Sequence, residues 1–349
     1  MSPLLEIKNL KVSFNTDDGV VHAVDGVSWS IEPGKTLGIV GESGSGKTVG
    51  GLSLLGLTRS ARTEIEGEAL LEGRDLLAMT DDELRSVRGG PISMIFQDPL
   101  SSLHPFFKVG AQIVEAIQAH QEISDDDARA RAVELLSLVG IPDPALRVDS
   151  WPHEFSGGMR QRAMIAMALA NNPKVLIADE PTTALDVTVQ AQVLQLLERL
   201  RDELGMAMVI ITHDLGVVAQ TADEIAVMYA GRIVERASTS ELFAAPKHPY
   251  TWGLLRSIPR LDTPPGEPLT PIDGRPPSLI NRPQGCAFAP RCPYSSEACV
   301  VTPPPLKQAG GSEHLAACVL DEKLRARAWD SLAAGGSQDE ARNILGVGK

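Results

Sequence analysis

The stretch Gly41-Glu42-Ser43-Gly44-Ser45-Gly46-Lys47-Thr48 decides the fold of this chain. It fits the pattern G-x-x-x-x-G-K-[ST], with an apolar run before it at residues 37–40 and a segment of helical character after it at 49–57. Glycines let the backbone curl so that successive N–H groups point at phosphate oxygens, and the following helix adds the positive end of its dipole. The order of strand, loop and helix therefore predicts a site for a nucleoside triphosphate.

The residues of this loop have separate expected roles. Lys47 is expected to reach the β and γ phosphates of the nucleotide, and Thr48 is expected to ligate Mg²⁺. The other expected phosphate contacts of the loop are Gly41, Ser43, Gly44 and Gly46. A dinucleotide fingerprint is the nearest alternative, but G-x-G-x-x-G starting at Gly44 would need glycine at the position that Val49 occupies.

Length and composition indicate a main domain with an appendage and an aliphatic α/β interior. The chain has 349 residues, of which 43% are hydrophobic and only 4% aromatic. Its net charge of −13 argues against binding nucleic acid over a large surface. No apolar run approaches the roughly 18 to 20 residues that span a bilayer, and residues 1–14 are unlike a signal peptide. We therefore expect a cytoplasmic protein whose membrane contact is indirect.

The pattern along the chain predicts a mixed α/β architecture. Residues 5–14 and 20–31 read as strands of an antiparallel sheet that precedes the phosphate loop. A helical subdomain is expected over about 98–172, with helices at 109–120 and 125–139. Beyond it, strands are expected at 174–178, 208–212 and 224–229. Their alternation with helices predicts a parallel sheet that binds ligands at its carboxyl ends.

Two carboxylates and a histidine follow the buried strands of this sheet. Asp179 and Glu180 come directly after the first of these strands, and His213 follows the second. We expect Asp179 to hold Mg²⁺ through water and Glu180 to act as general base on the attacking water. His213 lies where it can hydrogen-bond the γ-phosphate.

A second glycine element, Ser156-Gly157-Gly158, opens a helix whose free N–H groups can also hold phosphate. Two phosphate-binding elements for one nucleotide indicate a dimer. With this element the sequence resembles the ATP-binding cassette (ABC) ATPases over about residues 4–260. The matching motifs are the phosphate loop, Gln97-Asp98-Pro99, Ser156-Gly157-Gly158, Asp179-Glu180, Ala184-Leu185-Asp186 and His213.

The resemblance implies an α/β P-loop NTPase of ABC type over residues 1–260, with a mixed sheet core, an antiparallel β subdomain and a helical subdomain. In that family two nucleotide domains sandwich two ATP molecules. Ser156, Gly157, Gly158 and Asp186 would then contact the ATP of the partner subunit, and Phe14 would stack on adenine. Gln97 would bind Mg²⁺ and link it to the surface that touches transmembrane subunits. Lys47, Gln97, Glu180 and His213 are thus the expected catalytic residues.

Several short segments resemble the dipeptide and oligopeptide importer branch of this family. They are Phe155 and Met159 around the second glycine element, Ser101-Ser102-Leu103-His104-Pro105, Pro249-Tyr250-Thr251 and Ser257-Ile258-Pro259-Arg260-Leu261. The resemblance implies an ATPase that powers peptide import from the cytoplasmic face of the membrane. Its expected partners are a second, different ATPase subunit, two permease subunits and an extracytoplasmic binding protein.

Other functions stay open from the sequence. Nickel, glutathione or oligosaccharide are alternative cargoes. A soluble ABC ATPase that acts on DNA or ribosomes predicts coiled coils, two cassettes or a basic face, and this chain shows none of these features in its sequence. A regulator that senses a metal cluster, with a secondary ATPase, is a further alternative.

The last part of the chain is expected to form a loop-rich module at 261–330 and a flexible tail at 331–349. Residues 259–305 hold 13 of the 25 prolines, and a helix is expected at 321–332. Four cysteines follow the linker, at Cys286, Cys292, Cys299 and Cys318. We expect them to hold a [4Fe–4S] cluster, with zinc as second choice and four independent buried thiols as the simplest alternative. The segment around Cys286 and Cys292 also resembles the C-terminal extension of peptide-importer ATPases.

Overall fold

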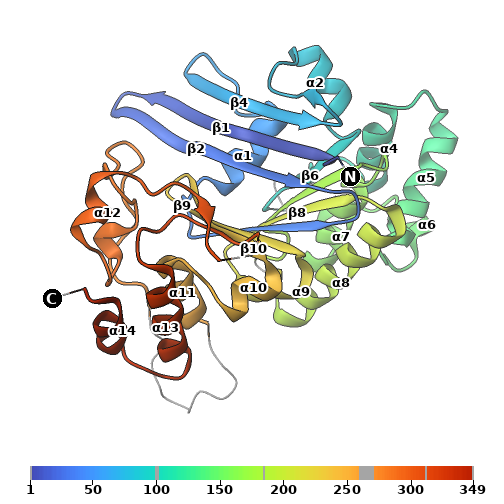
Figure 1. Cartoon of the computed structure of the whole chain (residues 1–349). Helices are drawn as coiled ribbons and strands as arrows, with labels where there is room; N and C mark the ends of the chain where they lie inside the picture. The colour runs from blue at the N-terminus through green and yellow to red at the C-terminus, as the bar shows by residue number, and fades with distance from the viewer. Residues whose placement is uncertain (1, 99–101, 184, 259–270, 311–312, 348–349) are drawn as a thin grey trace.

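Two β-sheets form the core of the protein, as a computed structural model shows (Figure 1). The structure describes residues 2–98, 102–183, 185–258, 271–310 and 313–347. Four parts of the motifs predicted above lie outside these ranges, namely Pro99, Ser101, Ala184 and Pro259-Arg260-Leu261.

The first sheet is antiparallel and has the strand order β2-β1-β4-β5. Its strands are β1 (Leu5–Thr16), β2 (Gly19–Ile31), β4 (Thr63–Leu71) and β5 (Arg74–Asp75). Alternate residues of β1, such as Leu5 and Ile7, are buried, as expected for a sheet with one face on the core. The predicted antiparallel sheet is confirmed, although residues 20–31 lie in a single long strand and β4 was not predicted.

The second sheet is mixed and has the order β11-β12-β10-β9-β3-β8-β7-β6. Its strands are β3 (Thr36–Val40), β6 (Ile92–Ile95), β7 (Val175–Asp179), β8 (Ala207–Thr212), β9 (Glu224–Tyr229), β10 (Arg232–Ser238), β11 (Lys307–Gln308) and β12 (Leu315–Ala316). Strand β3 pairs in parallel with β8 and β9, and every residue of β3, β7 and β8 is buried. The centre of the sheet is therefore covered on both faces. The carboxyl ends of its parallel strands lie along one edge, where sheets of this type bind ligands.

Most helices pack around this mixed sheet, and one lies beside β4 of the antiparallel sheet (Figure 1). Those of the cassette are α1 (Lys47–Leu54), α2 (Asp81–Val87), α4 (Val109–Gln118), α5 (Asp125–Leu138), α6 (Pro144–Arg147), α7 (Gly157–Ala168), α8 (Val187–Leu204), α9 (Leu215–Thr221), α10 (Thr239–Ala244) and α11 (Pro249–Arg256). Helices α4, α5 and α7 contact one another, and their apolar residues share one core cluster. Within the described ranges, no helix is both long and apolar enough to span a bilayer.

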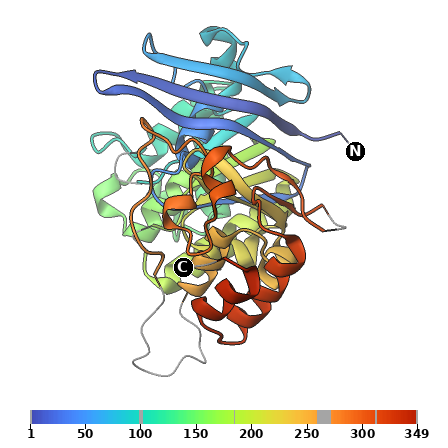
Figure 2. The same ribbon diagram turned by 60° about the vertical axis from the view of Figure 1, so that its left-hand side comes forward.

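The C-terminal region lies against the mixed sheet and extends it (Figure 2). It contains α12 (Glu297–Val301), α13 (Glu322–Ala333) and α14 (Gln338–Leu345). Strand β12 pairs with β10, so this region continues the sheet of the cassette.

The prediction of a flexible tail over 331–349 is wrong for α14. Ser337 and Glu340 form a reciprocal capping box at its start, and Ala341 and Leu345 are buried one turn apart. These two side chains join an aromatic cluster that contains Trp252 and Trp329. The capping sequence and the apolar spacing were both present in the sequence, and they outweigh the neighbouring glycines.

Candidate functional site

The phosphate loop passes so close to neighbouring backbone that two of its positions admit only glycine. A Cβ atom on Gly41 would lie 2.1 Å from the carbonyl oxygen of Met228, and one on Gly46 would lie 2.1 Å from that of Ala23. Gly46 also has a φ of 97°, in the left-handed region that side chains disfavour. The loop is therefore shaped by β2 and β9 on either side of it.

Lys47, the first residue of α1, turns its side chain back onto the phosphate loop and hydrogen-bonds to it. Its Nζ donates hydrogen bonds to the carbonyl oxygens of Gly41 at 2.7 Å and Glu42 at 3.0 Å, and the residue is only 6% exposed. Burial lowers the pKa of Lys47, while the negative charges of Glu180 and Asp179 oppose that shift. The structure thus places the predicted ammonium group at the centre of the loop.

Thr48 and Asp179 meet at the end of β7. The Thr48 hydroxyl donates to Asp179 Oδ1 at 3.1 Å, and Asp179 is 2% exposed. Burial raises the pKa of Asp179, and the hydrogen bond from Thr48 opposes the rise. A hydroxyl and a carboxylate side by side are ligands that suit Mg²⁺, which completes its shell with water and substrate phosphates. The donor set therefore fits the predicted Mg²⁺ site.

Three side chains contact the carboxylate of Glu180. Gln97 Nε2 donates to its Oε2 at 2.9 Å, Thr183 Oγ1 donates to the same oxygen at 2.9 Å, and His213 Nδ1 lies 3.2 Å from Oε1. Burial alone would raise the pKa of Glu180, but the bonds from Thr183 and His213 bring it below its usual value. The carboxylate is therefore ionised at neutral pH, as a proton acceptor must be.

The structure brings Asp179, Glu180 and His213 together, as the strand-end pattern predicted, and places Gln97, which the family resemblance implied, beside Glu180. Thr183 was missed by the sequence reading. The feature that could have indicated it is its position, because Thr183 carries a hydroxyl three residues after Glu180, within the turn that follows β7. Glu180 itself has a φ of 46°, so the turn holds it in a strained conformation that is typical of functional sites.

The second glycine element lies on an exposed helix end. Ser156 caps α7 by accepting the Met159 N–H at 3.3 Å, and Asp186 caps α8 by accepting the Val189 N–H at 3.0 Å. A Cβ atom on Gly157 would meet nothing within 4 Å, so the space beside it is open. Both caps are thus available to a group from outside the chain.

Phe14 is half-buried in β1, where it packs against the core cluster of the antiparallel sheet. Its pairing partner on β2 is Val21. Contact between Phe14 and adenine remains a prediction.

The predicted four-cysteine metal site is not supported. Among the described residues, no group of three or more His, Cys, Asp or Glu side chains is arranged to hold a metal ion, and all four cysteines are free thiols. Cys286 and Cys292 pack in apolar clusters, and burial raises the pKa of both. Burial also raises the pKa of Cys318 to about 11. Cys299 and Cys318 are buried and Cys286 and Cys292 are partly buried, an arrangement that is closest to the simplest alternative of four independent thiols.

Two family models match this chain. Residues 24–183 match the ABC transporter family, and residues 234–299 match the oligopeptide/dipeptide transporter C-terminal region. The second match begins in β10 and ends in α12, so it includes part of the region that extends the mixed sheet.

Relatives of similar length share about half of their residues with this chain. The oligopeptide transport ATP-binding protein OppD of Bacillus subtilis (strain 168) is 52% identical over 91% of this chain and 89% of that protein. The dipeptide transport ATP-binding protein DppD of the same organism is 51% identical over 86% of this chain and 89% of that protein.

Solved structures share the cassette fold. The dimeric post-hydrolysis structure of the ATP-binding cassette MJ0796, bound to ADP and Pi, has a TM-score of 0.60 and 28% identity, over 67% of this chain and 98% of that one. The chain is therefore an ABC ATPase and belongs to the ATP-binding proteins of the oligopeptide and dipeptide transporter branch.

Proposed function

We propose that this chain hydrolyses ATP to power the import of dipeptides or oligopeptides through a membrane ABC transporter. The observation that carries the proposal is the convergence of Gln97, Thr183 and His213 on Glu180, beside the Thr48–Asp179 pair. OppD and DppD, at 52% and 51% identity, support peptides as the cargo. Nickel, glutathione and oligosaccharides are the alternative cargoes.

In this mechanism the residues of the chain bind the triphosphate and prepare the attacking water. The loop N–H groups and Lys47 bind the phosphates. Thr48, Asp179 and Gln97 would hold Mg²⁺, which supplies positive charge to the phosphate oxygens. Glu180 accepts the proton of the water, and its low pKa keeps it ready to do so. His213 orients that carboxylate and contacts the γ-phosphate.

We infer that a second, different ATPase subunit completes the site. The exposed positions of Ser156, Gly157 and Asp186 support a second nucleotide-binding subunit, because they can contact the nucleotide of a partner. The expectation that this subunit is a different ATPase comes from the resemblance to the peptide-importer branch. The dimeric form of the MJ0796 cassette supports the pairing of two cassettes as well. The further partners are two permease subunits and an extracytoplasmic binding protein, with this chain peripheral on the cytoplasmic face of the membrane. An iron–sulfur cluster or a zinc ion has no part in the proposal, since the four cysteines form no metal-ligand group.

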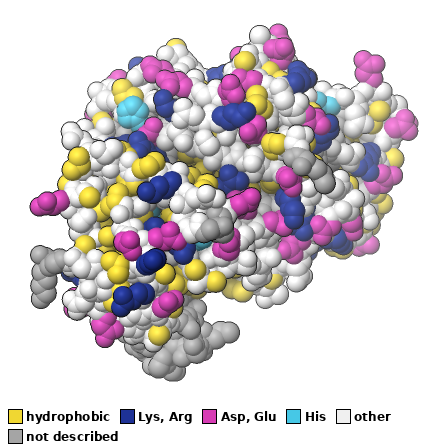
Figure 3. Space-filling view, in the orientation of Figure 1, with side chains coloured by type: hydrophobic (Ala, Val, Ile, Leu, Met, Phe, Trp, Pro, Cys, Tyr) yellow, Lys and Arg dark blue, Asp and Glu magenta, His cyan; other side chains and the backbone are white. Residues whose placement is uncertain are grey.

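Binding to nucleic acid is the less favoured function. The chain has a net charge of −13, and acidic and basic side chains are interspersed over the face that Figure 3 shows. Salt-sensitive retention of DNA in a filter-binding assay would revive this alternative.

The test is ATP hydrolysis by the purified chain, first alone and then in lipid with its candidate permease subunits, second ATPase and peptide-loaded binding protein. We expect strong activity only in the assembly. Equal activity of the chain alone would contradict the proposal. Uptake of labelled peptide, nickel, glutathione and oligosaccharide into vesicles would then identify the cargo.

A further inference from the structure

A partly buried ion pair links the C-terminal region to the phosphate loop. Arg291 is the last residue of the region's short 3-10 helix Ala289–Arg291, and Glu42 is the second residue of the loop. Arg291 Nη1 lies 2.7 Å from Glu42 Oε2, and Arg291 Nη2 lies 3.1 Å from Oε1. The side chains are 6% and 26% exposed, respectively. Such a two-bond fork fixes both position and orientation of the carboxylate.

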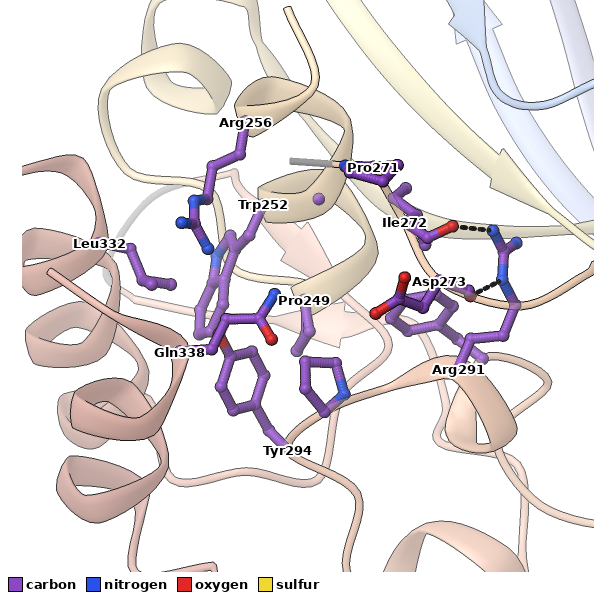
Figure 4. A pocket seen from close by; sticks show the side chains of 13 residues that line it. Pro249, Trp252, Arg256, Pro271, Ile272, Asp273, Arg291, Tyr294, Leu332 and Gln338 are labelled. Atoms are coloured by element: carbon purple, nitrogen blue, oxygen red, sulfur yellow. Dashed lines mark hydrogen bonds between the residues drawn. The ribbon is translucent and has the colours of Figure 1, made fainter. Parts of the chain in front are cut away.

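Arg291 is itself held in place by groups that do not belong to the loop (Figure 4). Its Nε donates to the carbonyl oxygen of Asp273 at 2.9 Å, and its Nη2 donates to that of Ile272 at 3.2 Å. The guanidinium also lies over the rings of Tyr229 and Phe288, at 5.9 and 6.0 Å from their centroids. The fork is therefore preorganised before it meets Glu42.

Glu42, held by Arg291, in turn contacts the catalytic residue Lys47. Its N–H donates to the Tyr250 hydroxyl at 2.9 Å, and its carbonyl oxygen accepts from Lys47 Nζ at 3.0 Å. The carboxylate of Glu42 also brings a negative charge into a loop that binds a polyanion. Without a counter-ion this charge would repel the phosphates, and Arg291 supplies that counter-ion.

We propose that Arg291 is a positioning residue that acts on the ATP site by neutralising the charge of Glu42, so that the C-terminal region sets the affinity of the phosphate loop for ATP. The role depends on ATP binding and is independent of the transported cargo. It assigns a nucleotide-linked function to a region that the sequence presented only as a cysteine-bearing appendage.

The experiment measures the dissociation constant of MgATP by calorimetry on the full-length chain, with Glu180→Gln in every variant to prevent hydrolysis. Arg291→Ala should weaken binding by about tenfold, because it exposes the phosphates to the unpaired charge of Glu42. Glu42→Gln should not weaken binding. The double variant Arg291→Ala/Glu42→Gln should return to within about threefold of the parent.

The matched control is Arg256→Ala. Arg256 lines the same pocket as Arg291 but belongs to α11 (Figure 4), and the variant removes one positive charge from the same part of the molecule. Its dissociation constant should stay within about twofold of the parent. Arg291→Lys, which keeps the charge without the fork, should be intermediate and covers the case in which the alanine variant does not fold.

Two results would overturn the inference. One is unchanged MgATP binding in Arg291→Ala, with a thermal unfolding midpoint that shows a folded protein. The other is equal weakening in Arg291→Ala, Glu42→Gln and the double variant, because a merely structural bond would be lost in all three.

Discussion

We expect the two glycine elements of this cassette to bind the same type of ligand, but their surroundings within the chain differ. In the phosphate loop, backbone oxygens of Met228 and Ala23 leave no room for a Cβ atom at Gly41 and Gly46. At Gly157 the space is open. The glycines of the loop are therefore required by the fold of this chain, and Gly157 is required, on our proposal, by a partner's nucleotide.

This difference divides the site into an inner and an outer half. The inner half comprises the phosphate loop, Asp179, Glu180 and their partners, and the C-terminal region supports it through Arg291. The outer half comprises Ser156, Gly157, Gly158 and Asp186. The inner half should bind ATP in the isolated chain, whereas the outer half should matter only in the assembly.

The largest expected effect is that of Glu180→Gln in the inner half. Hydrolysis by the assembled transporter should fall by about a thousandfold, because the proton acceptor is lost. ATP binding should persist, since Lys47 and Thr48 are unchanged. Steady-state phosphate release and nucleotide binding measured on the same preparation check both expectations. Hydrolysis near the wild-type rate would remove Glu180 from its role.

A pair of glycine variants compares the two halves directly. Gly46→Ala should lower the free energy of unfolding by about 3 kcal/mol or more, because of its φ of 97° and the contact with Ala23. Gly157→Ala should change it by less than about 1 kcal/mol, yet reduce hydrolysis in the assembly. Denaturant unfolding and assembly assays give the two readouts. Similar losses of stability in both variants would abolish the distinction between the halves.

The smallest expected effect is a dependence of stability on pH, and it comes from His248 at the start of α11. Burial lowers the pKa of His248, beside α11, to about 4. The unfolded chain therefore binds a proton at this position below about pH 6.5 that the folded chain does not. Stability should fall as pH drops from about 6.5 towards 4, by at most about 3 kcal/mol from this group.

Unfolding of the wild type and of His248→Asn at several pH values measures this contribution. Asparagine keeps an acceptor for the Tyr250 N–H, which His248 Nδ1 accepts at 3.1 Å, but it does not titrate. Its pH dependence over this range should be weaker. The same dependence in both proteins would show that other groups dominate.

The sequence was sufficient for the inner half because its residues lie in a contiguous motif or directly after buried strands. Lys47, Thr48, Asp179, Glu180 and His213 could be placed in this way, and the structure brings them together. Arg291 and Glu42 could not be paired, because 249 positions separate them and their contact depends on how the C-terminal region docks. A local pattern carries no such information.

For the cysteines, the sequence suggested a contact that the structure does not support. Their clustering in the sequence predicted a shared metal site, but spacing does not determine the distance or direction of side chains. Cys292 packs in apolar clusters on both sides, and this packing was not visible in the sequence. The terminal helix α14 was missed for a different reason, since glycine and polar residues before it were weighted above its capping box.

The bonds of Lys47 explain why arginine would be a poor substitute there. An ammonium group has three tetrahedral donors, of which two go to Gly41 and Glu42, and the third has only a long contact of 3.4 Å to Ser45 Oγ. That third donor is the one left for a phosphate oxygen. The donors of a guanidinium lie in one plane and cannot serve two carbonyls of a curled loop and a third partner above them. The loop thus selects the shape of its cation as well as its charge.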